Sequence, residues 1–316
     1  MINVIQADIS LLGLQDREKR QVMHAQDFGL PEGSHEQRIR AVTGEACKAA
    51  ESRGLKSLLL PVLSSRAEEI SPAAARVMVS EVRRYLSLGS GIEEVTFALP
   101  DEKGVQAFQE VAGRKKIVCL GDSITYGYPD GPQFSWVAAV AEATGHPFMN
   151  RGISGETTGQ MLARFERDVA AEEPAYVIFA GGHNDGWLGV SLAEVQENIR
   201  NVVRLAFDNG ICPILALPSP LNIRQMLQHY EGTGEEARRY FARLEQIRQW
   251  IDRYAGKRGL LTLDFHTPLL AGDSGEGDVR YLLDGGHPTH EGYRLLGEAA
   301  IRQLTGRLHF GKAEVA

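Results

Sequence analysis

The feature that most constrains this chain is an apolar run that ends in a glycine, an acid and a serine. The run covers residues 117–120, and Gly121, Asp122 and Ser123 follow it directly. Such a pattern predicts a buried strand that ends in a turn, with a helix behind it. In an open α/β sheet, ligands bind at the carboxyl ends of the strands, and the first residue of a helix has a free backbone N–H. Ser123 is therefore our candidate nucleophile and oxyanion donor, although this short motif alone more often marks a helix cap.

Strand patterns and helix patterns alternate along the chain, which predicts an α/β fold with parallel sheets covered by helices. In the first part we expect strands over residues 3–9, 58–63 and 95–99, and helices over residues 38–53 and 72–87. In the second part we expect five buried strands, over residues 116–121, 147–150, 176–180, 213–217 and 260–264. A basic turn near Gly113 separates the parts. We therefore expect two domains, residues 1–112 and 113–310, and a tail, residues 311–316.

Composition favours a small-molecule partner. The formal net charge is −7 and the sequence has no block of lysines or arginines, which argues against nucleic acid and against stable association with a membrane. Cys47, Cys119 and Cys212 are far apart in apolar surroundings, so we expect buried thiols and neither a disulfide nor a metal site. The N-terminus lacks a basic start with a long apolar stretch, so we expect a cytoplasmic protein.

Further polar residues follow the later strands and supply what a serine nucleophile needs. A serine hydroxyl reacts only when an imidazole takes its proton, and a carboxylate must orient that imidazole. Asp284 and His287 are three positions apart on one predicted turn and can do this together. Asn184, after the strand at 176–180, can donate to a developing oxyanion without carrying a charge.

Four short motifs that contain these residues follow one another along the chain: Gly121-Asp122-Ser123, the glycine loop around Gly155, the Gly182-x-Asn184-Asp185 segment, and Asp284-x-x-His287. Residues 114–308 thereby resemble the SGNH hydrolases, also called the GDSL lipase, esterase and acylhydrolase family. The resemblance implies a three-layer, flavodoxin-like α/β/α domain with a five-stranded parallel sheet. It also implies a triad of Ser123, Asp284 and His287, with an oxyanion hole of Ser123, Gly155 and Asn184, and it implies no cofactor and no metal.

Three neighbours of these residues receive supporting roles. We expect Asp122 and Asp185 to hold their loops by accepting backbone N–H groups. We expect His183 to line the cleft and not to act as a base. The segment from Leu221 to Gly232 is apolar at several positions and precedes a helix cap, so it can be a flap over the acyl site or a surface helix packed on its own domain.

Residues 1–112 resemble a shortened macro domain, an ADP-ribose-binding fold, in the stretches that begin at residues 1, 53 and 92. The family's glycine-rich ligand loops are absent: residues 13–37 are polar and charged, and the loop expected to cradle a phosphate reads Arg66-Ala67-Glu68-Glu69. We therefore expect this domain to have a structural role or to join copies of the chain into a homo-oligomer.

The resulting hypothesis is serine-dependent hydrolysis of a small carboxylic ester, on soluble short- to medium-chain or acetyl esters. An acyltransferase or a carbohydrate acetylesterase would use the same triad. A binding or scaffolding protein that keeps the loops without the activity is the alternative of another class.

Overall fold

The apolar runs of the sequence form two separate sheets, each in its own unit of the chain. The computed structural model describes residues 1–7, 34–62 and 71–311. One unit contains residues 1–115 with 206–212 and 306–316, and the other contains residues 116–205 and 213–305. The expected strand residues Asp8, Ile9 and Leu63, most of the polar stretch at 13–37 and the loop at Arg66–Glu69 lie outside the described residues.

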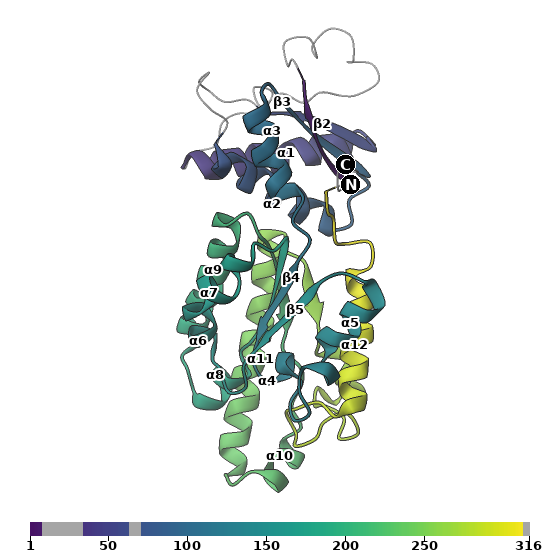
Figure 1. The fold of residues 1–316 in the computed structure, drawn as a ribbon. Helices are drawn as coiled ribbons and strands as arrows, with labels where there is room; N and C mark the ends of the chain where they lie inside the picture. Colours follow the sequence, from purple (N-terminus) through teal and green to yellow (C-terminus); the bar gives the residue numbers. More distant parts are fainter. Residues whose placement is uncertain (8–33, 63–70, 312–316) are drawn as a thin grey trace. The chain divides into compact units, whose positions relative to one another are not determined.

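The sheet of the first unit has three parallel strands in the order β1-β3-β2, with bounds β1 (Ile2–Gln6), β2 (Ser57–Pro61) and β3 (Glu94–Leu99). Its helices are α1 (His35–Ser52), α2 (Pro72–Ser87) and α3 (Glu102–Ala112) (Figure 1). A capping box at Ser34 starts α1, and a serine cap followed by proline starts α2. The likeness to a macro domain and the expected homo-oligomerisation stay predictions.

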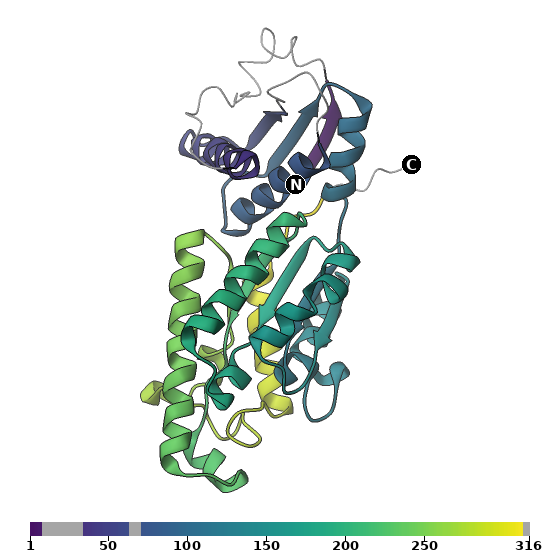
Figure 2. The same ribbon diagram turned by 90° about the vertical axis from the view of Figure 1, so that its left-hand side faces the viewer.

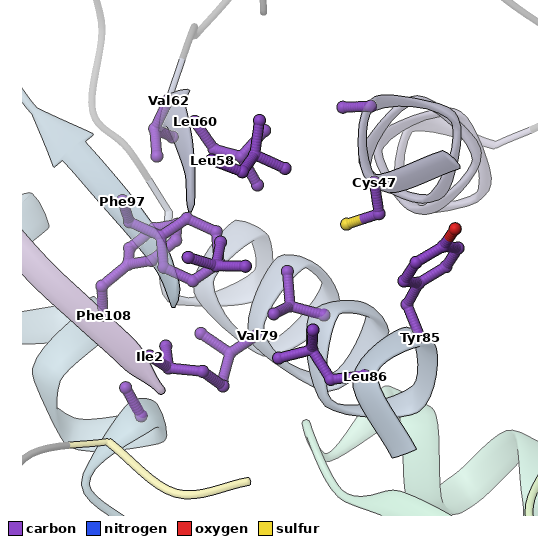
Figure 3. Packing of buried hydrophobic residues seen from close by; sticks show 14 of the residues in the cluster. Ile2, Cys47, Leu58, Leu60, Val62, Val79, Tyr85, Leu86, Phe97 and Phe108 are labelled. Atoms are coloured by element: carbon purple, nitrogen blue, oxygen red, sulfur yellow. The ribbon is translucent and has the colours of Figure 1, made fainter. Parts of the chain in front are cut away.

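Apolar side chains from the sheet and from α1, α2 and α3 form one core (Figure 3). Phe97 of β3 and Phe108 of α3 pack with ring centroids 5.0 Å apart, and Ile2 and Val79 lie in the same cluster. All three cysteines of the chain are buried and unpaired, as expected.

One buried cation joins segments of the first unit that are far apart in the sequence, and the domain limits expected from the sequence stay a prediction. The guanidinium of Arg83 donates to the carbonyls of Val111, Ala112 and Arg114, and also to that of His309. Residues 306–311 therefore lie with the first unit and not with the second. The segment 206–212 joins the first unit as well, where the ring of Phe207 lies 4.0 Å from the Arg40 guanidinium carbon.

The second sheet confirms the expected five strands. They are β4 (Ile117–Gly121), β5 (Phe148–Gly152), β6 (Tyr176–Ala180), β7 (Cys212–Leu217) and β8 (Thr262–Asp264), in the order β5-β4-β6-β7-β8. The helices of this part of the chain are α4 (Ser123–Tyr126), α5 (Trp136–Thr144), α6 (Thr158–Ala163), α7 (Phe165–Asp168), α8 (His183–Leu188), α9 (Leu192–Asp208), α10 (Ile223–His229), α11 (Gly234–Arg258) and α12 (His290–Leu304). Helices α5 and α12 lie on one side of the sheet and α6, α7 and α9 on the other (Figures 1 and 2).

In the described part of the chain, no helix is both long and apolar enough to cross a membrane, and the cytoplasmic location stays a prediction.

Strand order positions the site. Along the chain β4 comes first, yet β5 pairs on one side of it and β6 on the other, so the connection after β4 leads toward β5 and the connection after β6 leads the opposite way, toward β7. At such a switch point the loops that follow the two central strands separate and leave a crevice for a ligand. Ser123 follows β4 and His183 follows β6, so both lie beside this crevice.

Gly121, the last residue of β4, allows this close approach. A Cβ there would lie 2.1 Å from Thr125 Oγ1 and 2.7 Å from the Ala180 carbonyl oxygen. We expect Gly121→Ala to lower the free energy of unfolding by about 2 kcal/mol or more, because backbone must move to make room. Gly256→Ala is the control, since its new Cβ, on helix α11, meets nothing within 4 Å; it should raise stability by about 0.5–1 kcal/mol. Urea unfolding of both variants measures this, and equal effects would contradict the packing at Gly121.

Candidate active site

Ser123 opens helix α4 directly after β4, where the sequence predicted a turn. The Asp122 carboxylate caps this helix by accepting the N–H of Ile124 at 3.0 Å. Ser123 is 7% exposed, so its hydroxyl reaches a ligand only through the crevice. Its backbone N–H has no partner among the described residues, as is usual for the first turn of a helix.

Three of the expected side chains form one chain of hydrogen bonds. Ser123 Oγ lies 3.0 Å from His287 Nε2, and His287 Nδ1 lies 2.7 Å from Asp284 Oδ2. The other carboxylate oxygen, Oδ1, accepts the backbone N–H groups of Gly286 and His287 at 3.0 and 2.8 Å. This is the arrangement in which an imidazole can take the serine proton while a carboxylate stabilises the imidazolium.

The Asp284 carboxyl stays ionised. Burial by itself would raise its pKa, but hydrogen bonds from His287 and from the Tyr230 hydroxyl outweigh burial and hold the pKa well below its usual range. A carboxylate that accepts several hydrogen bonds favours its charged form in this way. Asp284 is therefore a permanent negative charge next to His287.

The serine and the histidine open into a hollow of about 390 Å³, within the usual size range of small-molecule sites. Its lining residues come from α4, α8, α10, α11 and the segment after β8; they are Ser123, Ile124, His183, Asn184, Trp187, Met226, Tyr230, Tyr240, Asp284, Gly286 and His287. A neighbouring hollow of about 500 Å³ shares Trp187, Met226, Tyr230 and Tyr240 with it. We call them the inner and the outer hollow.

The two other expected oxyanion donors lie differently. Asn184 lines the inner hollow, and its amide nitrogen donates to the carbonyl of Glu156 at 2.9 Å. An amide nitrogen carries two hydrogens, so a second one remains for a ligand oxygen. Gly155 is exposed, has a left-handed φ of 85° and is not among the lining residues of the inner hollow. Its role stays a prediction.

The three supporting residues are all buried. Asp185 accepts the backbone N–H and the hydroxyl of Thr158, at 2.9 and 2.6 Å. Burial raises the pKa of Asp122 to about 6, and its Oδ2 has no partner among the described residues. His183 lines the inner hollow, and burial lowers its pKa to about 3, so it stays neutral. Its two ring nitrogens lie 2.9 Å from the Tyr240 hydroxyl and 3.0 Å from the Ser219 hydroxyl.

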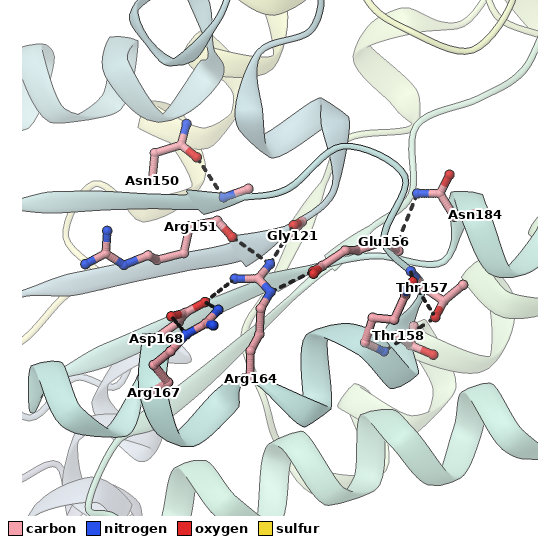
Figure 4. Close-up of polar contacts among 12 residues, drawn as sticks. Gly121, Asn150, Arg151, Glu156, Thr157, Thr158, Arg164, Arg167, Asp168 and Asn184 are labelled. Atoms are coloured by element: carbon pink, nitrogen blue, oxygen red, sulfur yellow. Dashed lines mark hydrogen bonds and ion pairs between the residues drawn. The ribbon is translucent and has the colours of Figure 1, made fainter.

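Arg164 was not singled out from the sequence, yet it ties three parts of the site together (Figure 4). Its guanidinium donates to the carbonyls of Gly121 and Arg151, at the ends of β4 and β5, at 3.1 and 2.9 Å. It also pairs with Glu156 at 2.6 Å and with Asp168 at 2.8 Å. In the sequence Arg164 stands between the apolar residues Leu162 and Phe165, and a charge among apolar residues was the signal that could have revealed it.

The segment from Leu221 to Gly232 contains the helix α10, and its role as a flap over the acyl site stays a prediction. Its residues Met226 and Tyr230 line both hollows, and Leu221 is buried. Tyr230 also contacts Asp284, a role that the sequence analysis missed because no local pattern marks a contact between positions so far apart.

Comparisons with known proteins agree on one family. The model of the GDSL-like lipase/acylhydrolase family matches residues 119–295. An uncharacterised lipoprotein of Bacillus subtilis, YqeF, is 29% identical over 48% of this chain and 67% of its own length. The esterase TesA of Pseudomonas aeruginosa is 31% identical over 31% of this chain and 52% of its own, so the chain spans about half of that relative's length. A solved structure described as a lipolytic protein of the G-D-S-L family from Desulfitobacterium hafniense has a TM-score of 0.52 and 34% identity, over 60% of this chain and all of that one.

Replacement of Arg164 tests its bridging role. Arg164→Met leaves two carbonyls and the Glu156 carboxylate without their donor, and it should lower the free energy of unfolding by about 3 kcal/mol. We also expect turnover to fall about 10-fold at a temperature where the variant is folded, because the ends of β4 and β5 carry the site.

Arg167→Met is the matched control, since Arg167 pairs with the same Asp168 but its side chain is 71% exposed. It should change neither unfolding nor turnover measurably. Denaturation curves and ester assays of both variants measure these effects. Equal effects of the two substitutions would contradict the role of Arg164 in joining the ends of β4 and β5 to Glu156.

Proposed function

Because the chain belongs to the GDSL-like lipase/acylhydrolase family and is therefore a carboxylic ester hydrolase, we propose that Ser123, His287 and Asp284 are its catalytic triad and that the reaction passes through an acyl-serine. The observation that carries this proposal is the unbroken series of hydrogen bonds from Ser123 Oγ through the imidazole to Asp284. A serine, a base and an orienting acid in this geometry have a known chemical use in acyl transfer.

The first half of the reaction transfers the acyl group to the enzyme. Ser123 Oγ attacks the ester carbonyl carbon while His287 Nε2 takes the hydroxyl proton. The carbonyl oxygen becomes an oxyanion that the Ser123 N–H, the Asn184 amide and the Gly155 N–H stabilise, and donors arranged before the reaction are effective for this purpose. His287 then gives its proton to the alcohol oxygen, the carbon–oxygen bond breaks, and the alcohol leaves.

The second half releases the acid. Water attacks the acyl-serine carbon, His287 takes one of its protons, and the oxyanion forms again in the same place. When it collapses, the bond to Ser123 Oγ breaks, and the serine recovers its proton from the imidazole. Asp284 keeps its negative charge throughout and holds Nδ1–H, which fixes the tautomer that leaves Nε2 free to accept.

Removal of the triad residues tests the proposal. Ser123→Ala and His287→Ala should each lower kcat by about 10⁴-fold or more, and the double variant should be little worse, because the residues act as a unit. Hydrolysis of p-nitrophenyl acetate measures this. Additive losses, or a Ser123→Ala enzyme that keeps its activity, would contradict the mechanism.

We infer that the substrate is a soluble ester with a short or medium acyl chain. The inner hollow has the size of a small-molecule site, and α10, Trp187 and Tyr240 wall it. Among p-nitrophenyl esters we expect acyl chains of about two to eight carbons to react faster than longer ones. Faster cleavage of long chains, with activation at a lipid–water interface, would contradict this inference.

The alternative enzyme activities would use the same catalytic residues, and the products of the reaction distinguish them. Acyl transfer would give a new ester when a sugar or alcohol acceptor is added to the assay, and a carbohydrate acetylesterase would release acetate from acetylated sugars faster than from p-nitrophenyl acetate. A binding or scaffolding protein would have the same loops without turnover on any ester. The complete set of nucleophile, base, acid and donors favours an enzyme.

A further inference from the structure

We propose that Tyr230 is a positioning residue for the triad: its hydroxyl holds the Asp284 carboxylate toward His287 and limits how strongly that carboxylate stabilises the protonated imidazole. This inference rests on the proposed function of Ser123, His287 and Asp284. It assigns a role in the chemistry to the residue that follows α10 and lines both hollows.

The contact that carries the proposal is the hydrogen bond from the Tyr230 hydroxyl to Asp284 Oδ2, 2.5 Å long. The same oxygen accepts from His287 Nδ1 at 2.7 Å, while Oδ1 accepts the two backbone N–H groups of its own turn. The carboxylate therefore has four donors, and Tyr230 and His287 share one oxygen. Burial and the bond to Asp284 raise the pKa of Tyr230, so the hydroxyl keeps the proton that it donates.

Tyr230 is held in place because α10 is fixed to the loop that carries the triad. The Asn222 N–H donates to the Gly285 carbonyl at 2.9 Å, and the Gln225 amide donates to the Leu282 carbonyl at 2.7 Å. Gly285 has a left-handed φ of 90°, and a Cβ there would lie 2.6 Å from the Asn222 carbonyl oxygen and equally close to Met226. Only a glycine lets the helix lie this close to Asp284.

Sharing an oxygen has a predictable electrostatic effect. A carboxylate that accepts a second hydrogen bond on the same oxygen is less basic toward the imidazolium, so less of its charge stabilises the protonated form. Removal of the Tyr230 hydroxyl should therefore favour protonated His287. The enzyme would then need a higher pH to reach full activity, because only the neutral imidazole can take the serine proton.

Tyr230 also lies where a substrate would touch it. Its ring lines the inner and the outer hollow, and its centroid is 5.8 Å from that of Trp187. A group bound in the outer hollow would contact the side chain that orients Asp284. Binding at a distance from the ester could in this way alter turnover as well as affinity.

Other groups around His287 could also influence the pH profile. The Tyr128 ring packs 4.5 Å from the imidazole, and Ser123 faces Nε2. His183 stays neutral, whereas Asp122 has a pKa raised to about 6 by burial and acts on His287 through its charge. Substitution of Tyr230 leaves Asp122 and its charge unchanged, so the difference between the two profiles isolates the effect of Tyr230.

The experiment compares kcat/KM against pH for the wild type, Tyr230→Phe and Tyr254→Phe, with p-nitrophenyl acetate as substrate. Tyr254 lies on α11, stacks on Trp250 with centroids 4.8 Å apart, and has no hydrogen bond to its hydroxyl among the described residues. We expect Tyr230→Phe to move the midpoint of the rise in kcat/KM to higher pH by about 0.5–1 unit. The plateau of kcat/KM at high pH should fall about 2- to 10-fold. Tyr254→Phe should follow the wild-type profile.

A second substitution keeps the shape of the side chain. Incorporation of 3-fluorotyrosine at position 230 makes the hydroxyl a stronger donor, so the midpoint should move in the opposite direction, to lower pH. Thermal unfolding of each variant checks that it is folded. A Tyr230→Phe profile that coincides with the wild type, or a change in KM or stability alone, would overturn the role of Tyr230. If Ser123→Ala kept its activity, the proposed function would fail, and that result is separate from any result at Tyr230.

Discussion

A hydrogen bond between Ser123 and His287, 164 positions apart in the sequence, is the interaction that the rest of the second unit serves. Ser123 follows β4 and His287 lies in the segment after β8, and because the strands are parallel both follow the carboxyl ends of strands, at the same edge of the sheet. Glycines at the ends of β4 and β5 let the chain approach closely there: a Cβ at Gly152 would lie 2.2 Å from the Tyr126 nitrogen. The sheet thus provides the crevice, and the loops provide the reactive groups.

Buried polar contacts hold those loops in place. Arg164 joins the ends of two strands to the loop that includes Glu156, and Asn184 donates to the Glu156 carbonyl from the other side. On the opposite side of the crevice, α10 lies on the Asp284 turn, with Gly285 as the point of closest approach. Each side of Ser123 is thereby fixed by groups that are costly to leave unpaired when buried. Rigid placement of this kind suits the proposed oxyanion site, whose donors must be arranged before the reaction.

The sequence was sufficient for features that local pattern determines. The five strands, the helix opening at Ser123 and the nearness of Asp284 to His287 follow from apolar runs, capping residues and short spacing. It was insufficient for contacts that depend on how distant elements pack. Arg164 appeared as one charged residue among apolar ones, and Tyr230 as part of a connection, because their partners lie 43 and 54 positions away. The contact of Arg83 with the carbonyl of a residue 226 positions later could not be foreseen for the same reason.

The central claim is that Ser123 carries the acyl group during turnover. Rapid quenching of the enzyme in acid during hydrolysis of a p-nitrophenyl ester, followed by proteolysis and mass spectrometry, tests it most directly. The expected result is one acyl adduct, on the peptide that contains Ser123 and on that serine, and its absence from the Ser123→Ala variant. Turnover without an adduct, or an adduct on another residue that disappears at the rate of turnover, would contradict the claim.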